Sequence, residues 1–448
     1  MKRAVRILFA ATASALLAVG GAVVATGAEA AEPDPVFGVP VFNDPAGSEA
    51  AQYAIFQQLA RLIDRVPAGE TIEMSWFEFK TPDYSDTTAR PAITDRLIKA
   101  HRRGVNVRIL LDGQVAGDGS SNATQPPYLR LKPELGTSET ASSYILLCAK
   151  NRGCIGKRKI GDADAYNHNK FLTATKVVLN NGAVKTGVVF QSSGNLGTWD
   201  ADTAYNNAIT WTEASSYANY KAYFKDLKKY RTSSTGDDNY YRVGASADQY
   251  KTHFFPRKET NGDYNQASTD TIVNVLDSVK CSYVGQTDGD PHQTDIRIVM
   301  WALTRTAVAK KLADLVKDGC WVDVVYSVTS TSALDALGNV GGRSIGITSC
   351  EARYGNRTIK AHSKYMLIDG AYDDDQIPRV FMGSHNYSLT ALRNADESMV
   401  RIRDSSVHEA YLHSNFYKVR DFCRANTTAA AAATTVLSDA AALRFDEG

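Results

Sequence analysis

The sequence predicts an α/β protein of two similar lobes, in which mixed or parallel sheets are flanked by helices and the lobes pack with pseudo-twofold symmetry. Two observations predict this fold. A helix that stops at a glycine and leads into a β-branched run occurs in both halves of the chain, and this pattern is typical of strand–helix–strand units with parallel strands. In addition, 448 residues exceed what one compact core usually holds.

The two halves contain the same succession of predicted elements. In the first half these are a helix at 54–65, a strand at 71–79, a helix at 91–104 and the strand VNVRILLDG. In the second half they are a helix at 269–279, a strand at 294–303, a helix at 307–319 and the strand CWVDVVYS. An internal repeat of this length indicates two related structural units. We assign half 1 to residues 36–235 and half 2 to residues 236–424.

The two ends of the chain differ in composition from the repeat. Residues 1–30 are predicted to be a signal peptide, because basic residues precede an apolar run that ends at the small-x-small pattern Ala28-Glu29-Ala30. The protein is therefore expected to be secreted into the extracellular space. Residues 425–448 form a low-complexity C-terminal tail, and its alanine- and threonine-rich start, 425–435, is expected to fray because it has no periodic apolar pattern.

The six cysteines predict three disulfides, since an even number in an exported chain usually pairs completely. Cys148 and Cys154 are close enough in sequence to pair with each other. The other four, Cys281, Cys320, Cys350 and Cys423, can pair in three ways, and the sequence does not choose between them. No CxxC motif or Cys/His cluster has the spacing of a zinc site.

The charge balance counts against a stable nucleic-acid partner. The chain has 50 Lys and Arg against 49 Asp and Glu. Residues 1–30 contain three of the basic and one of the acidic residues, so the remainder has a formal net charge of −1. Nucleic-acid binders usually carry a basic surplus, although a local basic patch can exist in a neutral total.

Each half contains one His-x-Lys pair, and the chain has no other. The pairs are His168 with Lys170 and His362 with Lys364. Both are predicted to lie in strands, where residues two apart project from the same face. Because the pairs occupy equivalent positions of the repeat, a shared catalytic role is favoured over two chance surface pairs.

A second polar motif follows each pair. A short apolar strand ends in Ser193-Gly194-Asn195 in the first half and in Ser384-His385-Asn386 in the second. Hydroxyl and amide groups at a strand end can donate hydrogen bonds to an anion. Eleven residues beyond each asparagine stand Asn206 and Glu397, which could accept a proton from an imidazole and fix its tautomer.

These motifs resemble the signature of the phospholipase D superfamily, His-x-Lys-x4-Asp followed by Gly-Ser-x-Asn, present twice per site. The second half matches it fully, with Asp369 as the acid and Gly383 as the glycine. The first half has Thr175 in place of the Asp and Ser192 in place of the Gly. Asp369 lies seven residues after the histidine, an odd offset that places it on the other face of a strand, so a structural role is expected for it.

The resemblance implies a phospholipase D fold and metal-independent phosphodiester chemistry through a phosphohistidine, with no cofactor. Catalytic roles fall to His168, Lys170, Asn195, His362, Lys364, Asn386 and Glu397, while Ser193 and Ser384 are expected to bind the substrate phosphate. By analogy with related enzymes, Glu397 orients His168 as nucleophile, His362 is the general acid, and Asn206 supports His362; the order of the two histidines stays open.

The expected function is hydrolysis of phospholipid headgroups, with transphosphatidylation as an accompanying activity, that is, lipid degradation by a phospholipase D. The expected partners are a phospholipid or another phosphodiester substrate and, transiently, a membrane surface; the protein is expected to be a monomer. One alternative is a metal-independent nuclease of the same superfamily. The other is a non-catalytic binding relative, which the first-half departures favour and the intact histidine pair opposes.

Overall fold

A computed structural model describes residues 32–82, 85–114, 120–232, 234, 236–244 and 249–443. The predicted signal peptide lies outside the described residues. The chain from Pro33 onward forms one compact unit. Within the described ranges, no helix has both the length and the apolar character needed to cross a membrane.

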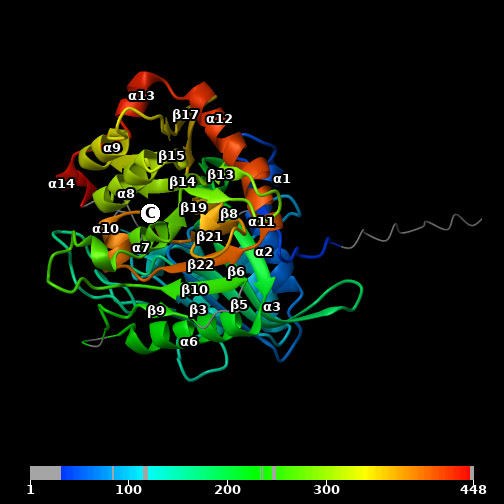
Figure 1. The fold of residues 1–448 in the computed structure, drawn as a ribbon. Coiled ribbons are helices and arrows are strands. Elements are labelled where there is room, and N and C mark those ends of the chain that lie inside the picture. The colour runs from blue at the N-terminus through cyan, green and yellow to red at the C-terminus, as the bar shows by residue number, and fades with distance from the viewer. Residues whose placement is uncertain are drawn as a thin grey trace, which may run out of the picture. The chain divides into compact units, whose positions relative to one another are not determined.

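The first half is built on a seven-stranded mixed sheet (Figure 1). In spatial order its strands are β1 (Pro40–Phe42), β8 (Asn207–Thr212), β6 (Val184–Ser192), β5 (Lys170–Val178), β2 (Thr71–Trp76), β3 (Asn106–Leu111) and β4 (Tyr144–Leu147). The β2, β3 and β4 strands run parallel, and the other neighbours pair antiparallel. The main helices are α2 (Ala54–Asp64), α3 (Ile93–Arg102), α4 (Pro126–Leu135) and α6 (Ala214–Tyr230).

The second half repeats this arrangement around a larger sheet. Its main path is β16 (Gly346–Ser349), β15 (Trp321–Ser330), β14 (Asp295–Leu303), β19 (Lys364–Asp369), β21 (Arg379–Gly383), β22 (Ser398–Arg403), β10 (Tyr250–Phe254) and β9 (Arg242–Val243). The main helices are α7 (Thr271–Asp277), α8 (Thr306–Lys317), α9 (Thr331–Gly338), α11 (Ser405–Tyr411) and α12 (Tyr417–Asn426). Again β14, β15 and β16 are parallel, while β14 pairs antiparallel with β19. The predicted two-lobed α/β fold is confirmed.

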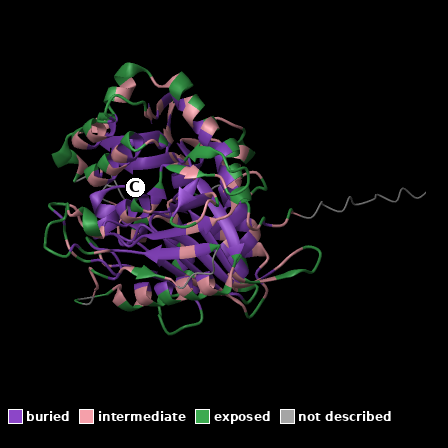
Figure 2. Cartoon of the chain, in the orientation of Figure 1, coloured by how far each residue is buried: buried purple, intermediate pink, exposed green. Residues whose placement is uncertain are grey.

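Three large apolar clusters hold these layers together, and Figure 2 shows buried strands beside helices with exposed outer faces. One cluster packs α2, α3 and α4 on the first sheet, and another packs α7, α8 and α9 on the second. The central cluster contains residues of both sheets, such as Val189 and Val380, together with α6, α11 and α12. Because these faces are buried against each other, strand ends of both halves meet at one interface.

Three disulfides link Cys148 with Cys154, Cys281 with Cys320, and Cys350 with Cys423, and no cysteine is free. The predicted complete pairing and the Cys148–Cys154 bond are confirmed. The structure also decides the pairing of the other four cysteines. Cys423 lies in α12, so the third bond ties this helix to the chain beside β16.

The expectation that residues 425–435 fray is wrong, and the chain is ordered as far as residue 443. Here α12 continues to Asn426 and is followed by α13 (Ala429–Ala433), β23 (Val436–Leu437) and α14 (Asp439–Ala442). The β23 strand pairs in parallel with the end of β15. Backbone pairing and side-chain caps from Thr428 and Ser438 order this segment, and neither needs the periodic apolar pattern that was missing from the sequence.

Candidate active site

The two histidines lie immediately before strands, and not within them as expected. The β5 strand begins at Lys170 and β19 begins at Lys364, so each lysine opens a strand and each histidine stands two residues earlier. This position lets each histidine backbone reach the opposite half. The His168 N–H donates to the Asp396 carbonyl at 2.9 Å, and the His362 N–H donates to the Tyr205 carbonyl at 2.9 Å. The interface between the halves therefore holds both histidines.

The imidazole of His168 is oriented by a carboxylate from the other half. Its Nδ1 lies 2.8 Å from Oε1 of Glu397, and both side chains are fully buried. An ionised carboxylate only accepts hydrogen bonds, so it keeps the proton on Nδ1 and leaves the Nε2 lone pair available for attack. The rings of Phe77 and Tyr166 pack edge-on against the imidazole, with centroids 5.0 and 5.6 Å away.

His362 has the corresponding environment with a neutral partner. Its Nδ1 lies 3.0 Å from Oδ1 of Asn206, and its Nε2 lies 2.9 Å from Nζ of Lys364. Since the ammonium can only donate, Nε2 accepts and Nδ1 carries the proton. Burial, followed by the charges of Lys364 and Lys170, lowers the pKa of His362 well below its ordinary value. His362 is therefore neutral in this structure.

The lysines are fixed by the same local geometry in both halves. Lys170 Nζ donates to the carbonyl of His168 at 2.8 Å, and Lys364 Nζ donates to the carbonyl of His362 at 2.8 Å. Lys364 also lies 3.3 Å from the carbonyl of Ser193, in the opposite half. Two ammonium groups held beside two imidazoles can stabilise the charge of a phosphoryl group without a metal ion.

The two Ser-x-Asn motifs lie at the same interface. Ser193 donates to Asn206 at 2.8 Å, and Ser384 donates to the Ser398 carbonyl at 3.3 Å. Here both hydroxyls hold the loop to the neighbouring strand, and their expected contact with substrate phosphate stays a prediction. The Asn195 N–H donates to Asp200 at 2.7 Å, and Asn386 Oδ1 accepts from the Ala302 N–H at 3.3 Å.

The first-half departure from Gly-Ser-x-Asn has a packing reason. A Cβ on Gly383 would lie 2.1 Å from the Ser398 carbonyl, so the second half requires glycine there. At the equivalent position, the Ser192 hydroxyl fits and accepts from the Gly194 N–H at 3.0 Å. Gly194 in turn cannot carry a side chain, because its Cβ would lie 2.8 Å from the Asn206 amide carbon. The first loop has therefore exchanged which of its residues is glycine without losing its polar groups.

The residues at the two acid positions of the signature, Thr175 and Asp369, lie far along the strands from the histidines. Thr175 and Asp369 each stand five residues after the lysine that opens the strand, which is about 17 Å along a strand. Thr175 accepts from the Thr71 N–H at 2.9 Å and donates to Glu70 at 2.7 Å. At this position the Thr175 side chain joins β5 to the start of β2, and the structural role expected for Asp369 stays a prediction.

Sequence reasoning missed Asp200 in α5 (Thr198–Asp202). Its Oδ1 lies 3.7 Å from His362 Nδ1, and its side chain is only 3% exposed. Burial raises the pKa of Asp200, while the Asn195 N–H and the charges of Lys170 and Lys364 act in the opposite direction. The sequence contains only an indirect signal for this residue. Asn206 is neutral where the other half has Glu397, which indicates that His362 has a second, acidic neighbour.

It also missed the aromatic residues at His362. The rings of Trp199 and Trp301 lie 5.3 and 5.2 Å from the imidazole. Trp301 corresponds to Phe77 of the first half, because their N–H groups donate to Ser363 and Asn169, the residues after the two histidines.

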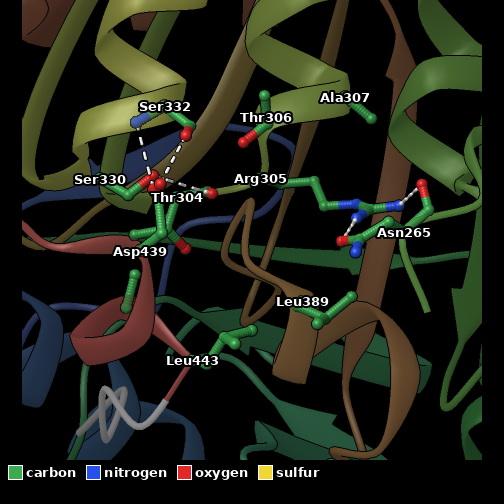
Figure 3. A pocket seen from close by; sticks show the side chains of 11 residues that line it. Asn265, Thr304, Arg305, Thr306, Ala307, Ser330, Ser332, Leu389, Asp439 and Leu443 are labelled. Carbon is green, nitrogen blue, oxygen red and sulfur yellow. Dashed lines mark hydrogen bonds between the residues drawn. The ribbon is translucent and has the colours of Figure 1, made fainter.

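A cavity of about 460 Å³ lies in the second half, and its lining contains none of the candidate catalytic residues (Figure 3). One side is the turn from Thr304 to Ala307, which follows β14 and its Trp301. The opposite side carries Leu389, three residues after Asn386, and the α14 segment. Figure 3 shows Ser332 directed at Asp439, which it bonds through N–H and hydroxyl at 3.1 and 2.5 Å. The C-terminal segment therefore forms part of the wall.

Two similar α/β halves that share one His/Lys site at their interface define a phosphoryl-transfer fold of the two-histidine type. The family model described as "Cardiolipin synthase, PLD-like domain" matches residues 62–228 and 292–418. The chain therefore belongs to the phospholipase D superfamily, whose members generally catalyse phosphoryl transfer or hydrolysis.

Several solved structures are similar to this chain at low sequence identity. Phosphatidylserine synthase of Haemophilus influenzae Rd KW20 matches with a TM-score of 0.50 and 12% identity, over 87% of this chain and 88% of that one. Polyphosphate kinase of Porphyromonas gingivalis matches with a TM-score of 0.48 and 12% identity, and the match spans 83% of this chain but only 48% of the kinase.

The phospholipase D family member Nuc of Salmonella typhimurium has a TM-score of 0.27 and 17% identity over 39% of this chain and 94% of Nuc. A search of curated proteins found no match. The likeness to phosphatidylserine synthase supports the fold.

Proposed function

We propose that this protein is an exported phospholipase D that hydrolyses phospholipid headgroups through a phosphohistidine, with transfer to alcohols as a competing outcome. The observation that carries the proposal is the 2.8 Å contact between Glu397 and His168 across the two halves. It leaves Nε2 of His168 as a nucleophile in a buried site that also contains two lysines and a second histidine. Three disulfides support export, because such bonds persist in oxidising compartments.

In the first step, His168 Nε2 attacks phosphorus, an N–P bond forms, and the P–O bond to the headgroup breaks. Glu397 stabilises the positive charge that develops on the imidazole. The leaving oxygen takes a proton from His362, which must carry one on Nε2 at that moment. A bound phosphodiester anion between Lys170 and Lys364 offsets the two charges that lower the pKa of His362, so substrate binding itself favours the protonated acid.

In the second step, neutral His362 removes a proton from water, whose oxygen attacks phosphorus and releases His168. An alcohol in place of water gives transphosphatidylation with the same bonds made and broken. The carboxyl of Asp200 lies 3.7 Å from His362 Nδ1, beside the neutral partner Asn206, and an imidazolium formed there favours its ionised form.

The test is turnover of purified protein with chelator present, on phosphatidylcholine and on single- and double-stranded DNA. We expect release of choline and no cleavage of DNA. Cleavage of DNA without choline release would replace the proposal with the nuclease alternative. No turnover of either substrate, together with tight lipid binding, would favour the non-catalytic relative.

A further inference from the structure

A second pocket, of about 290 Å³, lies on the outer face of the second sheet. Its lining contains none of the candidate active-site residues. Lys251 of β10 and Arg401 of β22 are direct partners in the ladder between these strands, and Phe381 of β21 faces Arg401 from the other side. Phe381 and the pocket residue Val275 belong to the outer apolar cluster of the second half, so the pocket opens away from the interface between the halves.

The pocket collects positive charge. Lys251, Arg257 and Arg401 line it, against a single carboxylate, that of the exposed Asp373. Within the part of the chain that the structure describes, Lys251 and Arg257 have no carboxylate at ion-pair distance. Arg257 is held in place by neutral groups: it donates to Thr271 at 3.1 Å and lies 4.5 Å over the Tyr241 ring.

Another charged pocket on the surface behaves differently. The pocket between α3 and α4 is also lined by cations, but there Arg102 pairs with Glu134 and Arg130 with Asp95. Its charges are satisfied within the protein. The contrast indicates that Lys251 and Arg257 of the outer pocket can bind an anion, since the described part of the chain gives them no carboxylate partner.

A buried histidine forms part of the outer pocket. His253 is 6% exposed, and its Nδ1 lies 3.0 Å from the Tyr241 hydroxyl. Burial, then the charges of Lys251 and Arg401, lower the pKa of His253 to about 3. The imidazole is therefore a neutral hydrogen-bonding group at neutral pH, and it lies among the three cations that line the pocket.

We propose that Lys251, Arg257 and Arg401 form an anion site that binds a phosphate group, separate from the catalytic histidines. Guanidinium and ammonium groups give short, charge-assisted bonds to phosphate oxygens. The Thr271 hydroxyl and the Tyr241 phenol at the same pocket supply neutral donors. A phosphate placed there relieves the mutual repulsion of the cations. The shared chemistry is a phosphoryl anion, taken either from a lipid headgroup or as free phosphate.

The test is a titration with inorganic phosphate, followed through the ring resonances of isotope-labelled histidine, with His253 assigned from His253→Gln. We expect phosphate to move the His253 resonance. Lys251→Gln and Arg401→Gln should each weaken the affinity read at that resonance by about tenfold or more. Lys258→Gln is the matched control, because this exposed lysine follows Arg257 in sequence but does not line the pocket.

A His253 resonance that phosphate leaves in place would overturn the proposal. An equal loss of affinity in Lys258→Gln would also overturn it, since the effect would then be diffuse surface charge. These readouts do not depend on turnover, so they stand whether or not the protein is a phospholipase.

The source of the phosphate is decided by sedimentation with phosphatidylcholine vesicles that contain phosphatidic acid. A His168→Ala background keeps the lipid intact. If the site takes a lipid headgroup, the combined Lys251→Gln and Arg401→Gln variant loses vesicle binding by about tenfold or more. If it takes free phosphate, the variant loses phosphate binding and keeps vesicle binding.

Discussion

Replacing Glu397 by glutamine tests the link between the two halves, because Glu397 belongs to the second half and His168 to the first. The substitution keeps the size of the side chain and removes its charge. In the phosphohistidine step a positive charge develops on an imidazole whose Nδ1 lies 2.8 Å from the carboxylate. With charge centres about 4 Å apart and an effective dielectric constant near 20, the lost attraction is about 4 kcal/mol.

That free energy corresponds to a loss of about 10³-fold in kcat. Glutamine can also donate to Nδ1 and place the proton on Nε2, which blocks attack and increases the loss. The assay is turnover of a soluble nitrophenyl phosphodiester, with pre-steady-state release of nitrophenol to isolate the first step. Glu134→Gln is the control, since Glu134 pairs with Arg102 on the surface. A kcat for Glu397→Gln within threefold of the parent protein would refute the assignment of Glu397 as the partner of the nucleophile.

Three further predictions follow from particular contacts. Thr175→Ala should leave turnover unchanged and lower the free energy of unfolding by about 1 kcal/mol, because it removes the bonds to Thr71 and Glu70; a large loss of kcat with normal stability would contradict this. The free energy of unfolding should fall as the pH drops below about 6.5, because the pKa of His253 is lowered to about 3 and that of His385 to about 4, so the unfolded chain binds these protons first. Between pH 7 and pH 5, the free energy of unfolding measured with denaturant should fall by about 2 kcal/mol less in His385→Asn than in the parent protein. Replacing Cys350 and Cys423 by serine should cost about 2–5 kcal/mol, measured in the same way, while thiol titration of the denatured, unreduced parent protein should find no free thiol.

Much of the fold could be predicted because local sequence patterns mark the repeated helices and strands. The helices α3 and α8 end near Gly104 and Gly319, and each is followed by a β-branched strand. The parts that could not be predicted depend on pairing between distant segments. The β1 strand joins the first sheet beside β8, and β23 extends the second sheet from the tail. Neither strand is longer than three residues, so its sequence carries almost no periodicity.

The site residues that have an equivalent in both halves could be predicted from the repeat. Glu397 and Asn206 could be identified because they stand at equivalent positions of the repeat. The resemblance to related enzymes then assigned each to the histidine of the opposite half, and the structure has both contacts. Asp200 could not be assigned in this way, since the equivalent position of the second half is Ala391. A residue that occurs in only one half cannot be found by comparing the two halves. The position of Asp200 beside His362 depends on how α5 folds against the interface.

The central claim is that one site uses both histidines, and the covalent intermediate tests it most directly. The measurement is acid-labile phosphate retained on the protein after rapid quenching with a nitrophenyl diester, in the parent protein, His168→Ala and His362→Ala. We predict no retained phosphate and no turnover of a natural diester in His168→Ala. In His362→Ala we predict accumulated phosphoenzyme, because a good leaving group needs little acid in the first step while water attack lacks its base. Full activity of His168→Ala on the natural diester would contradict the claim.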